Sequence, residues 1–159
     1  MLLSSLLSGV LYFLSFPPFG LWFLIFPSLA IFYISILPLE KVKNLNNRVS
    51  PEIHGFIFGS VAYGVILFGI QSIGLEAWIP LTILMGLMYS FFAKVFSYFG
   101  AKTKHNFFVL IGLISIFDLL RAYFPFGGFP WGYPSTVLVD SFTKNFYRAY
   151  GPIGFSLVV

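Results

Sequence analysis

The sequence predicts an all-α integral membrane protein: a polytopic bundle of about five full transmembrane helices plus an incomplete sixth, with a Pro/Gly-rich interfacial loop. Three observations predict this class. Only 9% of the 159 residues are charged, against about 25% in an ordinary soluble domain. Apolar residues make up 58% and aromatic residues 21%. The mean hydropathy is +0.93. These values exclude a water-soluble surface and a disordered chain, so residues 1–159 are expected to form a single polytopic membrane domain.

The first two expected spans are residues 2–16 and 21–37, and neither contains a charged residue. The turn between them includes Pro17, Pro18, Phe19 and Gly20. Two consecutive prolines remove two backbone donors and disfavour helix at the residue before each. Each run is shorter than the roughly 20 residues that a span usually needs. We therefore expect protein to shield this turn within the membrane or at its edge.

The third and fourth expected spans are residues 53–75 and 78–99. The third has no charged residue and is rich in small residues, with Gly55 and Gly59 forming a GxxxG pair. Small residues let helix backbones approach closely in lipid, which predicts a buried packing helix. The fourth contains one charged residue, Lys94, close enough to its end to extend toward water.

The fifth expected span, residues 106–124, contains Asp118 and Arg121. Residues three apart share a helix face, so these opposite charges can pair. Ionisable groups within the membrane are candidates for function by default. The alternative is a structural ion pair that neutralises both charges. The sequence leaves both interpretations open.

The end of the chain predicts an irregular loop and a short helix. Residues 125–134 contain three prolines and three glycines among aromatic side chains, a composition typical of an interfacial or re-entrant loop. The sixth apolar run, residues 146–159, is too short to cross a bilayer, since its last eleven residues, 149–159, reach only about 16 Å as a helix. We therefore expect the chain to be a fragment, a split gene product or a truncated reading frame.

The positive charges predict the orientation. Cytoplasmic loops carry an excess of Lys and Arg. The segments that end the second and fourth spans carry six of them: Lys41, Lys43, Arg48, Lys94, Lys102 and Lys104. We therefore expect a multi-pass protein with a cytoplasmic amino terminus and an outward-facing 125–134 loop.

Several kinds of site are excluded or disfavoured. The chain has no cysteine, which excludes disulfides, thiolate-bound metals and a cysteine nucleophile in these 159 residues. It has no closely spaced set of metal-ligating residues and no Walker lysine. We expect no metal, no cofactor and no nucleic-acid partner. The net charge of +4 is attributed to loops that face anionic lipid.

Two motifs together resemble a known family, the apolipoprotein N-acyltransferases. The segment 15–22, Ser-Phe-Pro-Pro-Phe-Gly-Leu-Trp, resembles the start of these proteins. Asp118-x-x-Arg121, followed by Gly128-Phe129-Pro130-Trp131, resembles their Glu-x-x-Arg-Gly and Thr-Gly-Phe-Pro-Trp segment. The Gly55/Gly59 pair and the 151–154 segment Gly-Pro-Ile-Gly follow in the family's order, so the similarity covers essentially the whole chain.

The resemblance implies a function in the bacterial cytoplasmic (inner) membrane. Family members transfer an acyl chain from a phospholipid to the amino group of a diacylglyceryl-cysteine at the amino terminus of a lipoprotein. Their nitrilase-like domain carries a Glu-Lys-Cys triad. That domain and its cysteine are absent here, so we expect no catalytic residue in this chain. Asp118 also replaces the family's Glu, and Ala122 its Gly.

These observations give two main hypotheses. In the first, the chain is the membrane portion of such an enzyme, with phospholipid, lipoprotein substrates and a separately encoded nitrilase-like domain as partners. In the second, it is a non-enzymatic membrane scaffold that binds lipid or a partner protein. A small transporter is less favoured, because no paired internal repeat is visible. The residues expected to form a substrate or lipid platform are Pro17, Pro18, Phe19, Gly20, Arg121, Gly128, Phe129, Pro130 and Trp131; the expected structural ion pair is Asp118 and Arg121.

The orientation can be tested by labelling, because the chain has no cysteine of its own. In Asn46→Cys, a membrane-impermeant thiol reagent should leave the protein unlabelled in intact cells and should label it after lysis. Labelling in intact cells would overturn the orientation.

Overall fold

The computed structural model describes residues 2–37, 49–102, 106–124, 127–129, 131–139, 148 and 151. The regular structure of these residues is helical and includes no strand, which confirms the all-α prediction for this part of the chain. The elements in chain order are α1 (Leu2–Leu14), η1 (Trp22–Leu24), α2 (Ile25–Ile36), α3 (Pro51–Ile66), η3 (Phe68–Ser72), α4 (Leu75–Lys102), α5 (Asn106–Tyr123) and η4 (Pro134–Leu138), where η denotes a 3₁₀ helix.

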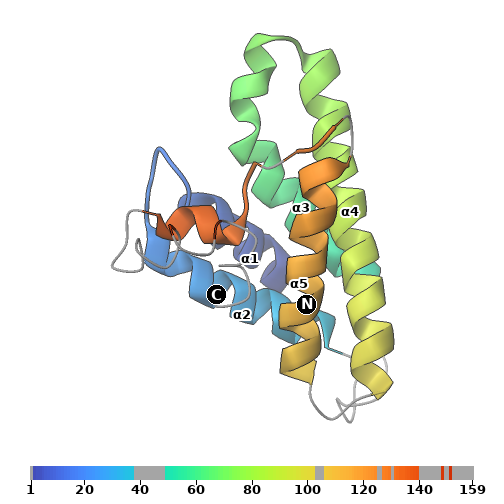
Figure 1. The fold of residues 1–159 in the computed structure, drawn as a ribbon. Helices are drawn as coiled ribbons and strands as arrows, with labels where there is room; N and C mark the ends of the chain where they lie inside the picture. Colours follow the sequence, from blue (N-terminus) through green and yellow to red (C-terminus); the bar gives the residue numbers. More distant parts are fainter. Residues whose placement is uncertain are drawn as a thin grey trace.

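The helices form two groups. α3 and α4 run side by side as a long hairpin, and α5 lies beside α4 (Figure 1). α1 and α2 pair with each other and cross this group, with α1 packed on α3 (Figure 1). After α5 the chain returns toward α1 and α2 and forms η4, the orange-red segment in Figure 1. This return brings Gly132, in the loop after α5, against Tyr12 of α1 and Tyr63 of α3.

The helices agree in part with the expected spans. α4 and α5 are long and apolar enough to cross a membrane by length and composition, whereas α1 and the segment Trp22–Ile36 are shorter apolar helices. The third expected span, 53–75, is not one helix: α3 ends at Ile66, and a 3₁₀ segment follows in a stretch that contains Gly64, Gly69 and Gly74. Glycine is a poor helix former, which explains the early end. The sixth expected run, 146–159, lies outside the described residues except for 148 and 151, so the number of spans stays a prediction.

The proline turn between α1 and α2 reverses the chain as the sequence predicts. The Pro17–Pro18 peptide bond is cis, and Gly20 has a φ of +64°. That left-handed conformation is accessible to glycine without steric cost. Hydrogen bonds from the Gly20 amide to the Phe16 carbonyl (3.0 Å) and from the Leu21 amide to the Leu14 carbonyl (3.2 Å) close the turn.

The glycine pair of α3 lies against α4. A Cβ atom on Gly55 would collide with the Tyr89 carbonyl oxygen. One on Gly59 would lie 2.8 Å from the Met85 carbonyl oxygen. Both glycines are buried, which confirms the predicted packing role. The α3–α4 approach is therefore close enough for backbone to touch backbone.

Polar side chains join α1 to its neighbours. Ser8 and Ser28 each donate to the other's backbone carbonyl at 2.8 Å, which links α1 to α2. The Ser5 hydroxyl and His54 Nδ1 lie 2.5 Å apart in the buried contact between α1 and α3. These bonds satisfy polar groups that would otherwise be costly in an apolar interior.

The core between the helices is largely aromatic. The rings of Phe32 and Phe58 stack at 4.1 Å, and Phe92 and Phe117 meet edge to face at 5.2 Å. Tyr89 contacts Phe58 at 5.1 Å in the same cluster. Such pairs add to the stabilisation from burial alone, and they bring α2, α3, α4 and α5 together.

The close α3–α4 contact predicts a site-specific loss of stability. Gly55→Ala should lower the free energy of unfolding by about 1–3 kcal/mol, because the new methyl group forces the helices apart. The control is Gly112→Ala in α5, where a Cβ would meet nothing within 4 Å. That change should be neutral or stabilising by up to about 1 kcal/mol. Equilibrium unfolding in mixed micelles measures both, and equal effects would contradict the packing argument.

Candidate functional site

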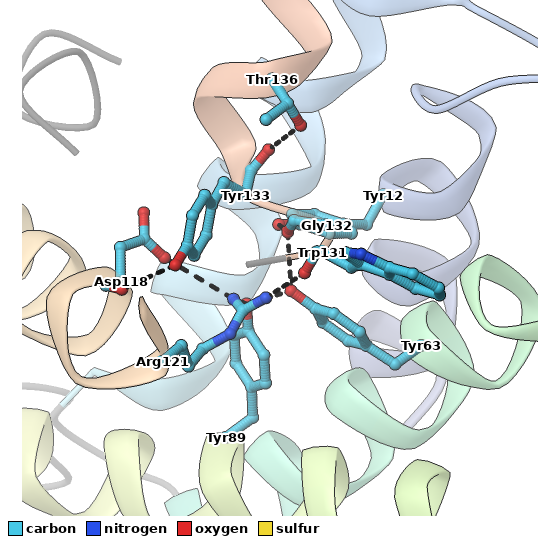
Figure 2. A network of polar contacts seen from close by, with 9 residues as sticks. All are labelled: Tyr12, Tyr63, Tyr89, Asp118, Arg121, Trp131, Gly132, Tyr133 and Thr136. Carbon is cyan, nitrogen blue, oxygen red and sulfur yellow. Dashed lines mark hydrogen bonds and ion pairs between the residues drawn. The ribbon is translucent and has the colours of Figure 1, made fainter. Parts of the chain in front are cut away.

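The loop that carries the Gly-Phe-Pro-Trp motif is bound from within the bundle through its backbone. The Gly132 carbonyl accepts hydrogen bonds from the Tyr12 hydroxyl (2.8 Å) and the Tyr63 hydroxyl (2.7 Å). The neighbouring Trp131 carbonyl accepts one from Arg121 Nη2. Figure 2 shows these donors converging on the loop from α1, α3 and α5. Two consecutive carbonyls are thus bound by interior side chains.

Arg121 lies at the centre of this network. Its side chain is 1% exposed, and Nη1 lies 3.6 Å from Asp118 Oδ1 and 3.5 Å from the Tyr89 hydroxyl. The guanidinium carbon lies 5.0 Å from the centres of the Tyr63 and Tyr133 rings, within range of a cation–π attraction. The expected ion pair between Arg121 and Asp118 is present, and it lies in the protein interior.

Two glycines let the loop approach α3 and α5. Gly132 has a φ of +72°, and a Cβ there would lie 2.8 Å from the Tyr63 ring. Gly128 has a φ of +117°, and a Cβ there would collide with the Ala122 carbonyl oxygen. The Phe129 amide next to it donates to the Arg121 carbonyl at 2.6 Å. Glycine is therefore required at both positions by conformation and by space.

Tyr133 extends the network to the residues after the loop. Its hydroxyl donates to the Asp118 backbone carbonyl at 3.0 Å, and its own carbonyl accepts from the Thr136 hydroxyl at 2.7 Å. Burial raises the pKa of the Tyr133 hydroxyl above its ordinary value. The group therefore keeps its proton at physiological pH and remains a donor.

Aromatic side chains face outward on the other side of the loop. Trp131 is 54% exposed, and its ring lies 5.5 Å from that of half-buried Phe129. Tyr123 and Phe124, at the end of α5, are exposed. We call Phe129 and Trp131 the aromatic rim. Their rings offer an apolar surface on a loop whose backbone is bound from inside.

The expected platform residues fall into separate places. Pro17, Pro18, Phe19 and Gly20 are all exposed, so the described residues do not shield this turn as the sequence predicts. Their turn begins shortly after Tyr12, whose hydroxyl donates to the Gly132 carbonyl of the loop. Gly128 is half-buried and Trp131 exposed, whereas Pro130 lies outside the described residues.

Arg121 does not lie at the surface, unlike Trp131 and residues 17–20, which are exposed. Its guanidinium lies behind the loop, where it binds the Trp131 carbonyl. A direct contact with a lipid phosphate would require this buried group to become exposed. In this structure Arg121 binds the loop from inside.

Sequence reasoning missed the tyrosines. Tyr12, Tyr63, Tyr89 and Tyr133 supply most of the hydroxyls in the network. One signal was present: Tyr63 lies four residues after Gly59 and eight after Gly55, on the same helix face. A tyrosine on a close-packed face needs a hydrogen-bond partner for its hydroxyl.

Metal binding has no support from the described ranges. No group of three or more His, Asp or Glu side chains gathers among them, and the sequence has no cysteine. The site is therefore built from a cation, carbonyls and phenols.

The comparison with protein families decides the identity. The family model described as the apolipoprotein N-acyltransferase N-terminal domain matches residues 8–159. The chain belongs to the apolipoprotein N-acyltransferase family. A curated relative, the apolipoprotein N-acyltransferase of Aquifex aeolicus (strain VF5), is 30% identical over 139 residues. No solved structure gives a match.

The match covers unequal shares of the two proteins. It spans 87% of this chain but only 30% of the Aquifex aeolicus relative. The network around Arg121 therefore belongs to the N-terminal domain of the apolipoprotein N-acyltransferase family.

Removing Arg121 should destabilise the protein. Arg121→Ala removes the guanidinium partner of Asp118 and a donor to the Trp131 carbonyl, at a cost of about 1–3 kcal/mol in the free energy of unfolding. The control, Lys102→Ala, removes an exposed cation and should cost less than about 0.5 kcal/mol. Both are measured by equilibrium unfolding in mixed micelles. If the free energy of unfolding falls no more in Arg121→Ala than in Lys102→Ala, the structural role of Arg121 is contradicted.

Proposed function

We propose that this chain is the membrane portion of an apolipoprotein N-acyltransferase, in which it holds lipid substrates beside a catalytic group supplied from outside these 159 residues. The reaction is the transfer of an acyl chain from a phospholipid to the amino-terminal diacylglyceryl-cysteine of a lipoprotein. The observation that carries the proposal is the loop itself. Its backbone is bound by buried side chains while the Trp131 ring of the aromatic rim is exposed.

The arrangement suits a substrate platform. Both substrates carry acyl chains, and an acyl-transfer step requires them to be held beside one nucleophile. Trp131 combines an apolar ring with an indole N–H, which suits the boundary between lipid and water. A loop whose backbone is already fixed loses little further conformational freedom when it binds.

The membrane setting is part of the proposal. Large apolar side chains are exposed along the helices, including Leu3 at 76% and Phe108 at 71%, which a water-soluble surface would disfavour. α4 and α5 have the length and composition of spans. We place the chain in the bacterial cytoplasmic membrane as a multi-pass protein, with its amino terminus in the cytoplasm and the loop facing outward.

The nucleophile must come from another domain or chain. The family's thioester chemistry needs a thiolate, and this sequence has no cysteine. The partners are therefore phospholipid, lipoprotein substrates and a nitrilase-like catalytic domain.

A scaffold without enzymatic function is the second candidate. The observation that favours it is the internal use of Arg121, whose guanidinium binds Tyr89, Trp131 and Asp118 within the chain. A scaffold needs this network but does not need the ring of Trp131. The two candidates therefore differ in what they require of the aromatic rim.

A chimera separates the two candidates. This chain would replace the matched part of the Aquifex aeolicus relative, and acyl transfer from phospholipid to a diacylglyceryl-cysteine peptide would be measured. Trp131→Ala should lower the rate of acyl transfer by about tenfold or more at a normal protein level. A tenfold loss corresponds to losing part of the binding free energy of one buried aromatic side chain. Phe99→Ala, which removes a comparably exposed ring from α4, should leave transfer unchanged.

The outcomes are distinct. Full activity of the Trp131→Ala chimera would exclude a platform role for Trp131 and would favour the scaffold function. Acyl transfer by this chain alone, without the rest of the relative, would overturn the need for an external nucleophile.

A further inference from the structure

The two carbonyls that face the interior determine where the Trp131 side chain points. The Trp131 carbonyl is bound by Arg121, and the Gly132 carbonyl is bound by Tyr12 and Tyr63. Gly132, between the two peptide planes, adopts a φ of +72°. With its carbonyl held inward, Trp131 directs its ring out of the bundle, where it is 54% exposed.

We infer that Tyr12 and Tyr63 are positioning residues, whose hydroxyls fix the Gly132 carbonyl and thereby hold the Trp131 ring in its outward orientation. Neither tyrosine touches the ring's exposed surface, since each is fully buried. They act through the backbone of the loop. The inference rests on the proposed function only where it assigns the exposed ring to substrate binding.

The direction of the hydrogen bonds determines which tyrosine contributes more to holding the loop. A phenol has one proton to donate. Tyr63 uses its proton for the Gly132 carbonyl, so in the 3.1 Å contact between Tyr63 and Tyr89 the Tyr89 hydroxyl must be the donor. The Tyr89 oxygen in turn faces Arg121 Nη1. The bonds therefore run in one direction, from Arg121 through Tyr89 and Tyr63 to the loop carbonyl.

Tyr63 and Tyr12 consequently differ in importance. Tyr63→Phe removes a donor to Gly132 and also removes the acceptor of the Tyr89 proton. Tyr12→Phe removes one of two donors to Gly132 and leaves the bonds from Arg121 through Tyr89 and Tyr63 to Gly132 in place. A buried donor without an acceptor costs more than the loss of a shared bond. Loosening of the loop should therefore be greater in Tyr63→Phe.

Two readouts report on the loop without depending on lipid binding. The first is hydrogen exchange at the Phe129 amide, which donates to the Arg121 carbonyl at the base of the loop. The second is the fluorescence of Trp131 as the only tryptophan, in a Trp22→Phe, Trp78→Phe background. The control substitution is Tyr33→Phe, which removes a hydroxyl from α2. That hydroxyl makes no hydrogen bond among the described residues.

The inference predicts a local effect. In Tyr63→Phe, exchange at the Phe129 amide should increase by about fivefold or more, as expected for loss of one net hydrogen bond. Trp131 emission should shift or broaden, and exchange in α5 away from the loop should stay unchanged. Tyr12→Phe should show the same changes to a smaller degree, and Tyr33→Phe should show neither.

Every outcome decides the inference. Unchanged Trp131 emission and Phe129 exchange in folded Tyr63→Phe would overturn it, as would a uniform rise in exchange through all helices, which indicates global destabilisation. If Tyr63→Phe does not fold, Tyr12→Phe decides by the same two readouts. Because neither readout involves transfer, a loop that loosens while the Trp131→Ala chimera stays active would refute the proposed function and leave this inference standing.

Discussion

A guanidinium buried in an apolar helix bundle must have its charge and its N–H groups met by the protein, because hydrocarbon and ring edges offer no adequate substitute. Arg121, at 1% exposure, meets this requirement through its two Nη atoms, which face Asp118, the Tyr89 hydroxyl and the Trp131 carbonyl, whereas Nε has no hydrogen-bond partner among the described residues. The last partner belongs to a loop whose own peptide groups also need partners. The same contacts therefore bind a buried cation and anchor an irregular segment.

The helix packing makes this arrangement possible. Gly55 and Gly59 let α3 approach the backbone of α4, and Tyr63, on the same face, then lies 3.1 Å from Tyr89. The aromatic core behind these tyrosines holds α2 and α5 in place. The small residues in α3 thus affect the position of the loop, because they set the place of Tyr63, whose hydroxyl binds the Gly132 carbonyl. The exposed Trp131 ring of the aromatic rim depends on contacts that lie inside the bundle.

Much of this could be predicted from the sequence, for physical reasons that differ between elements. The proline turn, the Gly55/Gly59 contact and the Asp118–Arg121 pair follow from local rules of backbone freedom and helical spacing, and the structure confirms each. The early end of α3 was missed because its apolar composition continues beyond Ile66 although its geometry changes. The tyrosine donors were missed because Tyr12 and Gly132 are 120 residues apart, and no local pattern reports such a contact.

The central claim is that Arg121 and the tyrosines hold the loop as one unit, and a double-mutant cycle measures this directly. The free energy of unfolding would be compared for Tyr63→Phe, Arg121→Lys and the double variant in the same micelles. If the groups act together, the double variant loses less stability than the sum of the single losses, by about 0.5 kcal/mol or more. Losses that simply add would contradict the account, since they would mean that Arg121 and Tyr63 stabilise the protein independently.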